Sequence, residues 1–294
     1  MITIVITAYK EPRTIGKAIE QVLRNKIGED YEIIVIAPDK ETLSEAEKYA
    51  KKNRKIKLLK DAGKGKPAAL NLAFKRAKGR IIVMTDGDVY IGKKAILEIL
   101  KKFDDREVGI VSGMPVSLAP RETIFGFWSH ILTDTAHNIR VDRVKRGEMI
   151  VCSGYLYAVR KGIVEKIPEE ALSEDAVLSH LVYEKGYKTA YSPESDVYVK
   201  YPDNFNDWIK QKKRSAGGYN QLSYMVKSKK RMRSFFTEST GIFQVLGYPR
   251  TVKEFFYTLM LILARLYLWG LIFIDVNLRK RSLKKIWVRV ESTK

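Results

Sequence analysis

Three short runs of consecutive apolar residues constrain the fold most strongly. Met1–Ala8 reads MITIVITA, Tyr31–Ala37 reads YEIIVIA and Arg80–Thr85 reads RIIVMT. Each run is rich in β-branched residues and lacks the alternation of a half-exposed strand, so each is expected to form a strand buried on both faces. A polar turn follows each run. Because the carboxyl ends of parallel strands meet at one sheet edge, these three loops are expected to converge around a ligand.

Segments with helical spacing separate these runs. The pattern predicts helices over Thr14–Asn25, Glu41–Asn53, Pro67–Ala77 and Lys93–Phe103, and further strands over Ile56–Leu59 and Val108–Ser112. Downstream it predicts helices over Thr123–Arg140 and Ser173–Lys185, and strands over Met149–Val159 and Lys188–Tyr191. The alternation of strands and helices predicts an α/β fold with a mostly parallel central sheet flanked by helices on both faces.

Charge divides the chain into two parts. The 294 residues carry a net charge of +20, and residues 200–294 hold 20 basic and 6 acidic side chains, a net of +14. We therefore expect one domain over 1–199 and a basic C-terminal helical region over 200–294. A basic region suits an anionic membrane surface or nucleic acid. No helix-turn-helix, zinc or RNA-binding pattern appears, so nucleic acid is not an expected partner and a nucleic-acid-binding protein is the remote alternative.

The basic region contains one long apolar segment. Phe255–Ile274 is 20 residues long with a single charge, Arg265, and as a helix of about 30 Å it could cross a bilayer. A single span would place the basic residues of 279–289 across the membrane from a cytosolic catalytic domain, against the positive-inside tendency. We therefore expect a helix over about 252–275 that lies in the membrane interface, on the cytoplasmic face, in preference to a true span.

Two flanking segments agree with a peripheral or monotopic attachment. Residues 235–248 could pair with the apolar helix as a re-entrant hairpin, and residues 227–233 include five basic side chains that suit anionic headgroups. Both arrangements keep the basic residues on the cytoplasmic face of the membrane.

The turn Asp86-Gly87-Asp88 directly follows the third buried strand. Two carboxylates that flank a glycine can both enter the same loop, and a Mg²⁺-type ion takes one or two carboxylates together with substrate phosphates. Such a turn is also common without any function. We interpret it as a site for Mg²⁺ or Mn²⁺, with Asp88 as the metal ligand and Asp86 nearer the nucleotide.

Four further segments appear in order around this turn: Val5–Glu11 (VITAYKE), Gly65–Asn71 (GKPAALN), Ser173–Asp175 (SED) and Gln211–Arg214 (QKKR). With Asp86–Asp88 they cover roughly residues 2 to 218. In these motifs the chain resembles family 2 glycosyltransferases of the GT-A fold. The resemblance implies a GT-A domain, a nucleotide-diphospho-sugar donor and a divalent cation.

The resemblance and the chemistry together assign the nucleotide-sugar contacts to Thr7, Tyr9, Glu11, Asp39, Lys66, Asn71, Asp86, Gln211 and Arg214. Lys66 opens a helix after a glycine loop, a natural phosphate contact, and Gln211 and Arg214 share a helical face at i, i+3. Around Asp39 the sequence departs from the paired acids of the family, which leaves the base open. Ser215 stands where processive synthases carry Trp, so a processive polymerase is not expected.

The segment Ser173-Glu174-Asp175 is assigned to acceptor chemistry. An inverting transfer to a hydroxyl needs a carboxylate base, and we assign that role to Asp175, with Glu174, Ser153 and Gly154 near the acceptor. An acidic first turn also stabilises a helix without any catalysis, and Ser153-Gly154 could be a strand bulge. The expected acceptor is lipid-linked or a glycan. A polyprenyl-phosphate glycosyltransferase is the main alternative, and a nucleotidyltransferase on a related sheet is a further one.

Overall fold

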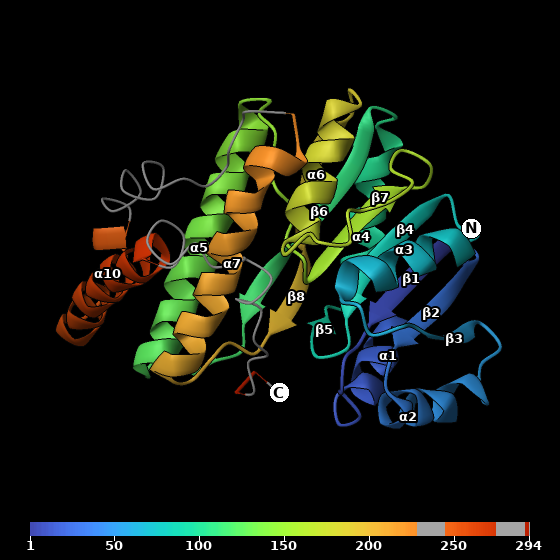
Figure 1. The fold of residues 1–294 in the computed structure, drawn as a ribbon, viewed down its shortest axis with the longest axis horizontal. Coiled ribbons are helices and arrows are strands. Elements are labelled where there is room, and N and C mark those ends of the chain that lie inside the picture. Colours follow the sequence, from blue (N-terminus) through green and yellow to red (C-terminus); the bar gives the residue numbers. More distant parts are fainter. Residues whose placement is uncertain (228–244, 275–291, 294) are drawn as a thin grey trace.

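The computed structural model of the chain describes residues 1–227, 245–274 and 292–293. Its centre is an eight-stranded sheet in the order β3-β2-β1-β4-β7-β6-β8-β5 (Figure 1). The strands are β1 (Ile2–Thr7), β2 (Tyr31–Ala37), β3 (Ile56–Lys60), β4 (Ile81–Asp86), β5 (Tyr90–Ile91), β6 (Val108–Ser117), β7 (Leu156–Arg160) and β8 (Lys188–Val199). The α/β fold predicted from the strand and helix pattern is confirmed.

The sheet is parallel in its first half and mixed in its second. β1 pairs in parallel with β2 and β4, and β2 pairs in parallel with β3. β7 runs antiparallel to both β4 and β6, whereas β6 and β8 are parallel. Because Thr85 near the end of β4 pairs with Leu156 at the start of β7, the loop before β7 lies at the same edge as the loops that follow the parallel strands.

Helices cover both faces of the sheet, as predicted. They are α1 (Ile15–Leu23), α2 (Lys40–Ala50), α3 (Lys66–Arg76), α4 (Ala95–Lys101), α5 (Ile124–Lys145), α6 (Glu174–Glu184), α7 (Phe205–Met225) and α10 (Val252–Phe273), with a 3₁₀ turn η1 at Lys102–Asp104. Alternate strand residues point to opposite faces. Ile4 and Ile6 therefore pack in the core with α1, α2 and α4, and Val5 packs in the core with α3 and α6.

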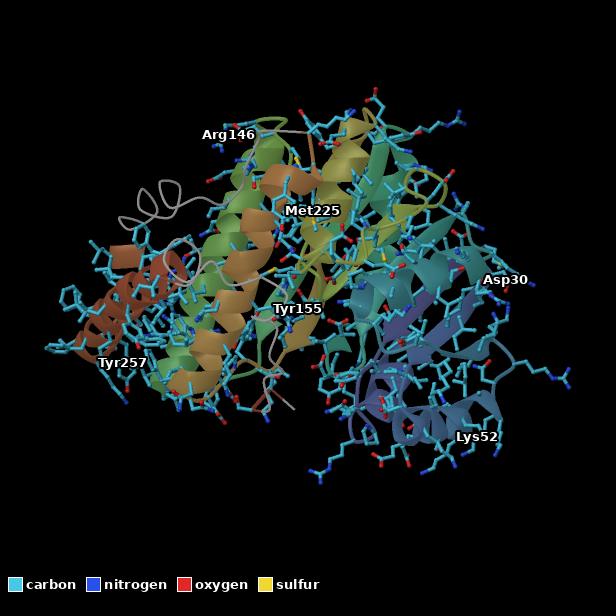
Figure 2. The ribbon with its side chains drawn as sticks, in the orientation of Figure 1. Asp30, Lys52, Arg146, Tyr155, Met225 and Tyr257 are labelled. Atoms are coloured by element: carbon cyan, nitrogen blue, oxygen red, sulfur yellow. The ribbon has the colours of Figure 1, made fainter. Side chains whose placement is uncertain are left out.

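A third apolar core lies away from the sheet, where α10 packs against α5 and α7. Its members include Phe127 and Trp128 from α5, Trp208 from α7 and Leu261 from α10. The rings of Trp128 and Trp208 are 5.1 Å apart between centroids, so α5 and α7 meet near their N-terminal ends. Figure 2 shows Tyr257 of α10 at the opposite side of the molecule from Lys52, which lies in the turn after α2.

The strand predicted over Met149–Val159 is wrong in its first half. The chain before β7 is buried, but it forms no ladder there. Side-chain hydroxyls accept its backbone amide hydrogens instead, so the backbone is satisfied without a neighbouring strand. The donor amides are those of Ile150, Cys152 and Ser153, and the acceptors are the hydroxyls of Thr189, Ser179 and Ser112, respectively.

Some predicted elements are shorter than the observed ones, and some predicted segments lie outside the described residues. β6, β8 and α5 all extend beyond the predicted ends. β8 ends at Val199 and α7 begins at Phe205, and the division at residue 199 stays a prediction. Most of the basic cluster over 227–233 and of the hairpin segment over 235–248 lies outside the described residues.

Candidate active site

A cavity of about 1790 Å³ opens at the carboxyl edge of the parallel strands and continues between α5, α7 and α10. Figure 2 shows Tyr155, which lines it, near the middle of the molecule between the sheet and the long helices. Most of the predicted site residues line this single cavity. They are Thr7, Tyr9, Glu11, Lys66, Asp86, Asp88, Ser153, Gly154, Glu174, Asp175, Gln211 and Arg214.

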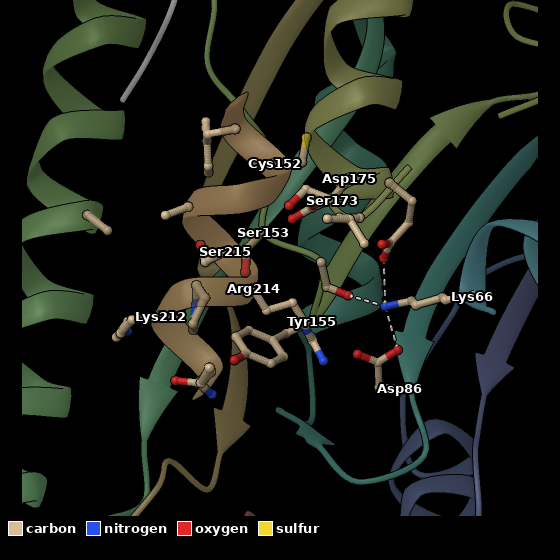
Figure 3. A pocket seen from close by; sticks show the side chains of 18 of the residues that line it. Lys66, Asp86, Cys152, Ser153, Tyr155, Ser173, Asp175, Lys212, Arg214 and Ser215 are labelled. Carbon is tan, nitrogen blue, oxygen red and sulfur yellow. Dashed lines mark hydrogen bonds and ion pairs between the residues drawn. The ribbon is translucent and has the colours of Figure 1, made fainter. Parts of the chain in front are cut away.

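Lys66 lies at the centre of the site, where contacts converge on its ammonium group (Figure 3). Its Nζ is 2.6 Å from Asp86 Oδ1 and 3.1 Å from Glu174 Oε1, and it donates to the Gly154 carbonyl at 3.0 Å. Burial disfavours the charge, but Asp86 and Glu174 outweigh it and raise the pKa of Lys66 well above its ordinary value. A protonated ammonium thus joins β4, α6 and the loop before β7.

The local sequence places Lys66 at the first position of α3. Gly65, just before it, has φ +105°, a backbone conformation that side chains rarely adopt. The lysine therefore begins its helix directly at the cavity wall.

The Asp86-Gly87-Asp88 turn packs tightly against the loop after β1. Thr7 Oγ1 donates to Asp86 Oδ1 at 2.8 Å, and the Gly87 amide donates to the Thr7 carbonyl at 2.8 Å. A Cβ at Gly87 would lie 2.8 Å from Glu11 Oε2 and 2.9 Å from Ala8 Cβ. Only glycine fits there without a shift of its neighbours, so the turn and the β1 loop form one wall.

The described residues contain no group of three or more His, Cys, Asp or Glu side chains that could hold a metal ion. Asp86 and Asp88 nevertheless line the same cavity and supply carboxylate oxygens. Mg²⁺ commonly binds through one or two carboxylates while phosphates and water complete its ligands. These two side chains fit a cation shared with a diphosphate better than a site built from protein ligands alone.

Asp175 lies in the first turn of α6, against the loop before β7. Its Oδ1 accepts the Ala176 amide at 2.9 Å, and a Cβ at Gly154 would be 3.1 Å from its Oδ2. Burial and the neighbouring Glu174 raise the pKa of Asp175 to about 6, while Lys66 opposes the rise. Asp175 is therefore more readily protonated than an ordinary aspartate.

α7 rests directly on the turn that begins α6. A Cβ at Gly218 would overlap Ser173 Oγ and lie 2.7 Å from Ser173 Cβ, and Gln221 Oε1 accepts the Leu172 amide at 2.8 Å. This close contact fixes the helix that brings Gln211 and Arg214 to the cavity. Figure 3 shows Arg214 beside Tyr155, on the side of α7 that faces Lys66.

Asp39, which was predicted to contact the nucleotide sugar, lies in a hydrogen-bond network at the start of α2. It caps α2, since its Oδ1 accepts the Thr42 amide at 2.9 Å, and its Oδ2 accepts the Lys10 amide at 2.8 Å. Lys10 has φ +54°. Burial opposes the charge, but these hydrogen bonds hold the pKa of Asp39 below its ordinary value. Asp39 thus shapes the loop after β1 and does not line the cavity.

Asn71, also predicted as a nucleotide-sugar contact, is not among the residues that line the cavity. Its side chain is buried, donates to the Ile167 carbonyl at 2.8 Å and accepts the Ile167 amide at 2.8 Å. Both polar atoms of the amide are therefore engaged. Asn71 fixes the segment after β7 to α3 and lies away from the cavity wall.

Among the cavity-lining residues that sequence reasoning did not assign to the site are Asp61 and Tyr155. Asp61 follows β3 at the same sheet edge, and burial raises the pKa of its carboxyl; its place after a strand was a signal available in the sequence. Tyr155 precedes β7 and packs edge-on against Tyr201 with 6.1 Å between ring centroids. Burial raises the pKa of Tyr155 to about 12, so it is a neutral wall of the cavity. In the sequence, the only indication that Tyr155 belongs to the site is its position directly after Ser153-Gly154.

Comparisons with known proteins identify relatives of this chain. Residues 3–167 match the model of the family described as glycosyl transferase family 2. A probable glycosyltransferase, YdaM, of Bacillus subtilis is 26% identical over 74% of this chain and 54% of its own length. A poly-beta-1,6-N-acetyl-D-glucosamine synthase of Staphylococcus aureus is 25% identical over 75% of this chain and 55% of its own length. The chain spans about half the length of these curated relatives.

Solved structures share the fold. A mannosyltransferase of Pyrobaculum calidifontis, solved with GDP-Man and Mn²⁺, superimposes with a TM-score of 0.67 at 17% identity and covers 90% of this chain and 80% of its own. TarS of Staphylococcus aureus, residues 1–349 with UDP-GlcNAc, gives a TM-score of 0.52 at 14% identity over 84% of this chain and 81% of its own.

Proposed function

This chain belongs to glycosyl transferase family 2, and we propose that it moves a sugar from a UDP-sugar or GDP-mannose to a hydroxyl acceptor with inversion at the anomeric carbon. The observation that carries the proposal is the position of Lys66. Its ammonium contacts Asp86 of the D-G-D turn and Glu174, the neighbour of Asp175. One group thus links the carboxylates suited to a donor with those suited to an acceptor.

On the donor side, the chain offers oxygen ligands and cations around one point. Asp88 and Asp86 would hold Mg²⁺ or Mn²⁺, and the bound cation would offset charge on the departing diphosphate. Lys66 and Arg214 line the same cavity, and a guanidinium suits a diphosphate in a bidentate manner. The solved neighbours named above hold GDP-Man in one case and UDP-GlcNAc in another, so either base agrees with the fold.

On the acceptor side, Asp175 would remove the proton of the attacking hydroxyl. A pKa of about 6 keeps this carboxylate ionised at neutral pH and basic enough to accept a proton. Glu174 contacts Lys66 through Oε1, so it is suited to positioning. The attack would come from the face opposite the diphosphate, which inverts the anomeric centre.

The acceptor is proposed to be lipid-linked and the chain to work at the cytoplasmic face of a membrane. Among the described residues, α10 alone is long and apolar enough to cross a membrane. One of its faces, including Leu261 and Leu268, packs against α5 and α7, while Leu263 on another face is 65% exposed. A helix held to the catalytic domain along one face favours embedding in the interface over a lone span.

Replacing Asp175 with asparagine tests the proposal. The full chain in detergent would be given labelled UDP- or GDP-sugars, Mn²⁺ and membranes as the acceptor source, with transfer into solvent-extractable product as the readout. Asp175→Asn should reduce transfer by about 10²–10⁴-fold, because the base is lost, with unchanged stabilisation by UDP or GDP. Asp104→Asn, at an exposed residue, is the matched control.

Two results would contradict this assignment. Full transfer by Asp175→Asn would favour a phosphate acceptor, which needs no strong base, and hence the polyprenyl-phosphate alternative. Absence of any stabilisation of the wild-type chain by UDP or GDP with Mn²⁺ would overturn the nucleotide-sugar donor.

A further inference from the structure

The catalytic cavity continues well beyond the reaction centre, into the space between α5, α7 and α10. On α5, the lining residues Phe125, Leu132 and Ile139 recur every seven positions and so share one helical face. On α10, Ile262 and Trp269 show the same spacing. Each helix therefore turns one continuous stripe toward the same space.

The chemistry of this space changes along its length. The end at the sheet is polar and holds Lys66, Asp86 and Asp175. The part between the helices combines the apolar stripes of α5 and α10 with polar and charged residues, and its cations include Lys212 of α7 and Arg265 of α10. An apolar channel with cations that leads to a sugar-transfer centre matches an amphiphile whose phosphate separates a sugar from a hydrocarbon chain.

Leu266 connects the channel to the outer surface of α10. It lines the cavity and is also 58% exposed. Its neighbours Leu263 and Tyr267 are exposed as well, on the apolar face that the proposed function places in the membrane interface. A hydrocarbon chain could pass from that interface into the channel at Leu266 and lie against apolar side chains such as Ile262 and Leu132.

We propose that the space between α5, α7 and α10 binds the hydrocarbon chain of a lipid-linked sugar acceptor, with Lys212 and Arg265 serving the phosphate that joins the sugar to the lipid. The proposal rests on the proposed function, because it names the acceptor class of the same site.

A blocking substitution tests the channel directly. Ala136 lines the cavity in the middle of α5, so Ala136→Phe would fill the path of the chain. Asn138 is exposed on the same helix, and Asn138→Phe adds a side chain of equal size outside the channel. Binding of dansyl-labelled geranylgeranyl phosphate to the full chain in detergent would be followed by energy transfer from tryptophan, since Trp208 and Trp269 line the cavity.

We expect Ala136→Phe to weaken binding at least tenfold and Asn138→Phe to leave it within twofold of wild type. Unlabelled geranylgeranyl phosphate should compete, geranylgeraniol should compete more weakly, and inorganic phosphate should not compete. Replacing both Lys212 and Arg265 with glutamine should abolish the preference for the phosphate over the alcohol. Equal binding by Ala136→Phe and Asn138→Phe would overturn the proposal, as would full competition by inorganic phosphate.

A second measurement covers the case in which Ala136→Phe does not fold. A diazirine-bearing geranylgeranyl phosphate, photolysed with the wild-type chain, should label residues of the channel such as Leu132 and Ile262. Labelling confined to the outer face, at Leu263 and its neighbours, would overturn the channel. Stabilisation by UDP or GDP with Mn²⁺ is measured alongside. Its absence while lipid binding persists would overturn the donor assignment and leave the channel intact.

Discussion

The cavity that we propose to be catalytic has two walls, which we call the donor wall and the acceptor wall after their proposed roles, and the two are built in different ways. On the donor wall, Thr7 and Asp86 end neighbouring parallel strands, and their contact follows from the register of β1 and β4. On the acceptor wall, Asp175 and Arg214 come from α6 and α7, whose relative position depends on the contact between Gly218 and Ser173. The sheet fixes the donor wall locally, whereas helix packing between distant parts of the chain fixes the acceptor wall. Lys66 contacts both walls.

The largest expected effect comes from removing the group that joins the walls. Lys66→Met would leave Glu174, which is buried, without its cation. Unpaired buried charges cost about 3–5 kcal/mol, and the partial exposure of the lysine side chain, 24%, reduces this to about 2–3 kcal/mol. Chemical denaturation would measure the loss of unfolding free energy, and transfer should fall below detection.

A double substitution separates charge from packing at this position. Lys66→Met combined with Glu174→Gln removes the unpaired carboxylate, so it should recover at least half of the lost unfolding free energy without restoring transfer. If the double variant were no more stable than Lys66→Met, the connection between the walls would not be electrostatic.

A matched pair of glycine substitutions probes each wall separately. Gly87→Ala and Gly218→Ala both force a methyl group into occupied space, and each should cost about 1–3 kcal/mol of unfolding free energy. Gly87→Ala should weaken stabilisation by UDP or GDP with Mn²⁺. Gly218→Ala should lower transfer while nucleotide stabilisation remains. Equal effects of both variants on nucleotide stabilisation would show that the two walls do not act separately.

The pH dependence of transfer should report on the acceptor wall. Below the pKa of Asp175, about 6, the base is protonated and transfer should fall about tenfold per pH unit. Glu174 helps to raise that pKa, so Glu174→Gln should move the acid limb to lower pH. An acid limb that stays near pH 6 in Glu174→Gln, or that persists in Asp175→Asn, would assign it to another group.

The same shift has a consequence for stability. The pKa of Asp175 in the folded state lies above its ordinary value of 3.8. The contribution of Asp175 to the free energy of unfolding is therefore largest below pH 3.8, and it is lost as the pH rises through about 6. The free energy of unfolding of Asp175→Asn, relative to that of wild type, should therefore rise by on the order of 1–3 kcal/mol from pH 4 to pH 8. Thermal unfolding at the two pH values would measure this change.

The smallest expected effect separates the two roles considered for Asp39. As a helix cap, Asp39→Ala should cost about 1 kcal/mol and leave stabilisation by UDP or GDP nearly unchanged. Asp61→Asn, on the cavity wall, should instead weaken nucleotide stabilisation with little loss of unfolding free energy. The reverse result would assign the contact with the nucleotide base to Asp39.

The sequence could predict the donor wall better than the rest, for a physical reason. A buried strand followed by a polar loop is a local pattern, and it placed Thr7 and Asp86 at the same edge. Asn71 could not be interpreted this way, because its partner Ile167 is distant in the sequence and only the fold brings them together. Asp39 was ambiguous, since an aspartate between a strand and a helix suits both a ligand contact and a cap.

Strand β7 joins two parts of the sheet, and this arrangement affects how the chain is made. β4 pairs with β1 on one side and with β7 on the other, and on the order of 70 residues separate β4 from β7, which take roughly 4–14 s to synthesise. During that interval the nascent chain exposes one strand edge, a hazard for aggregation. Once β7 has been synthesised, its pairing with β4 closes that edge and also brings Ser153 and Gly154 to the proposed catalytic centre.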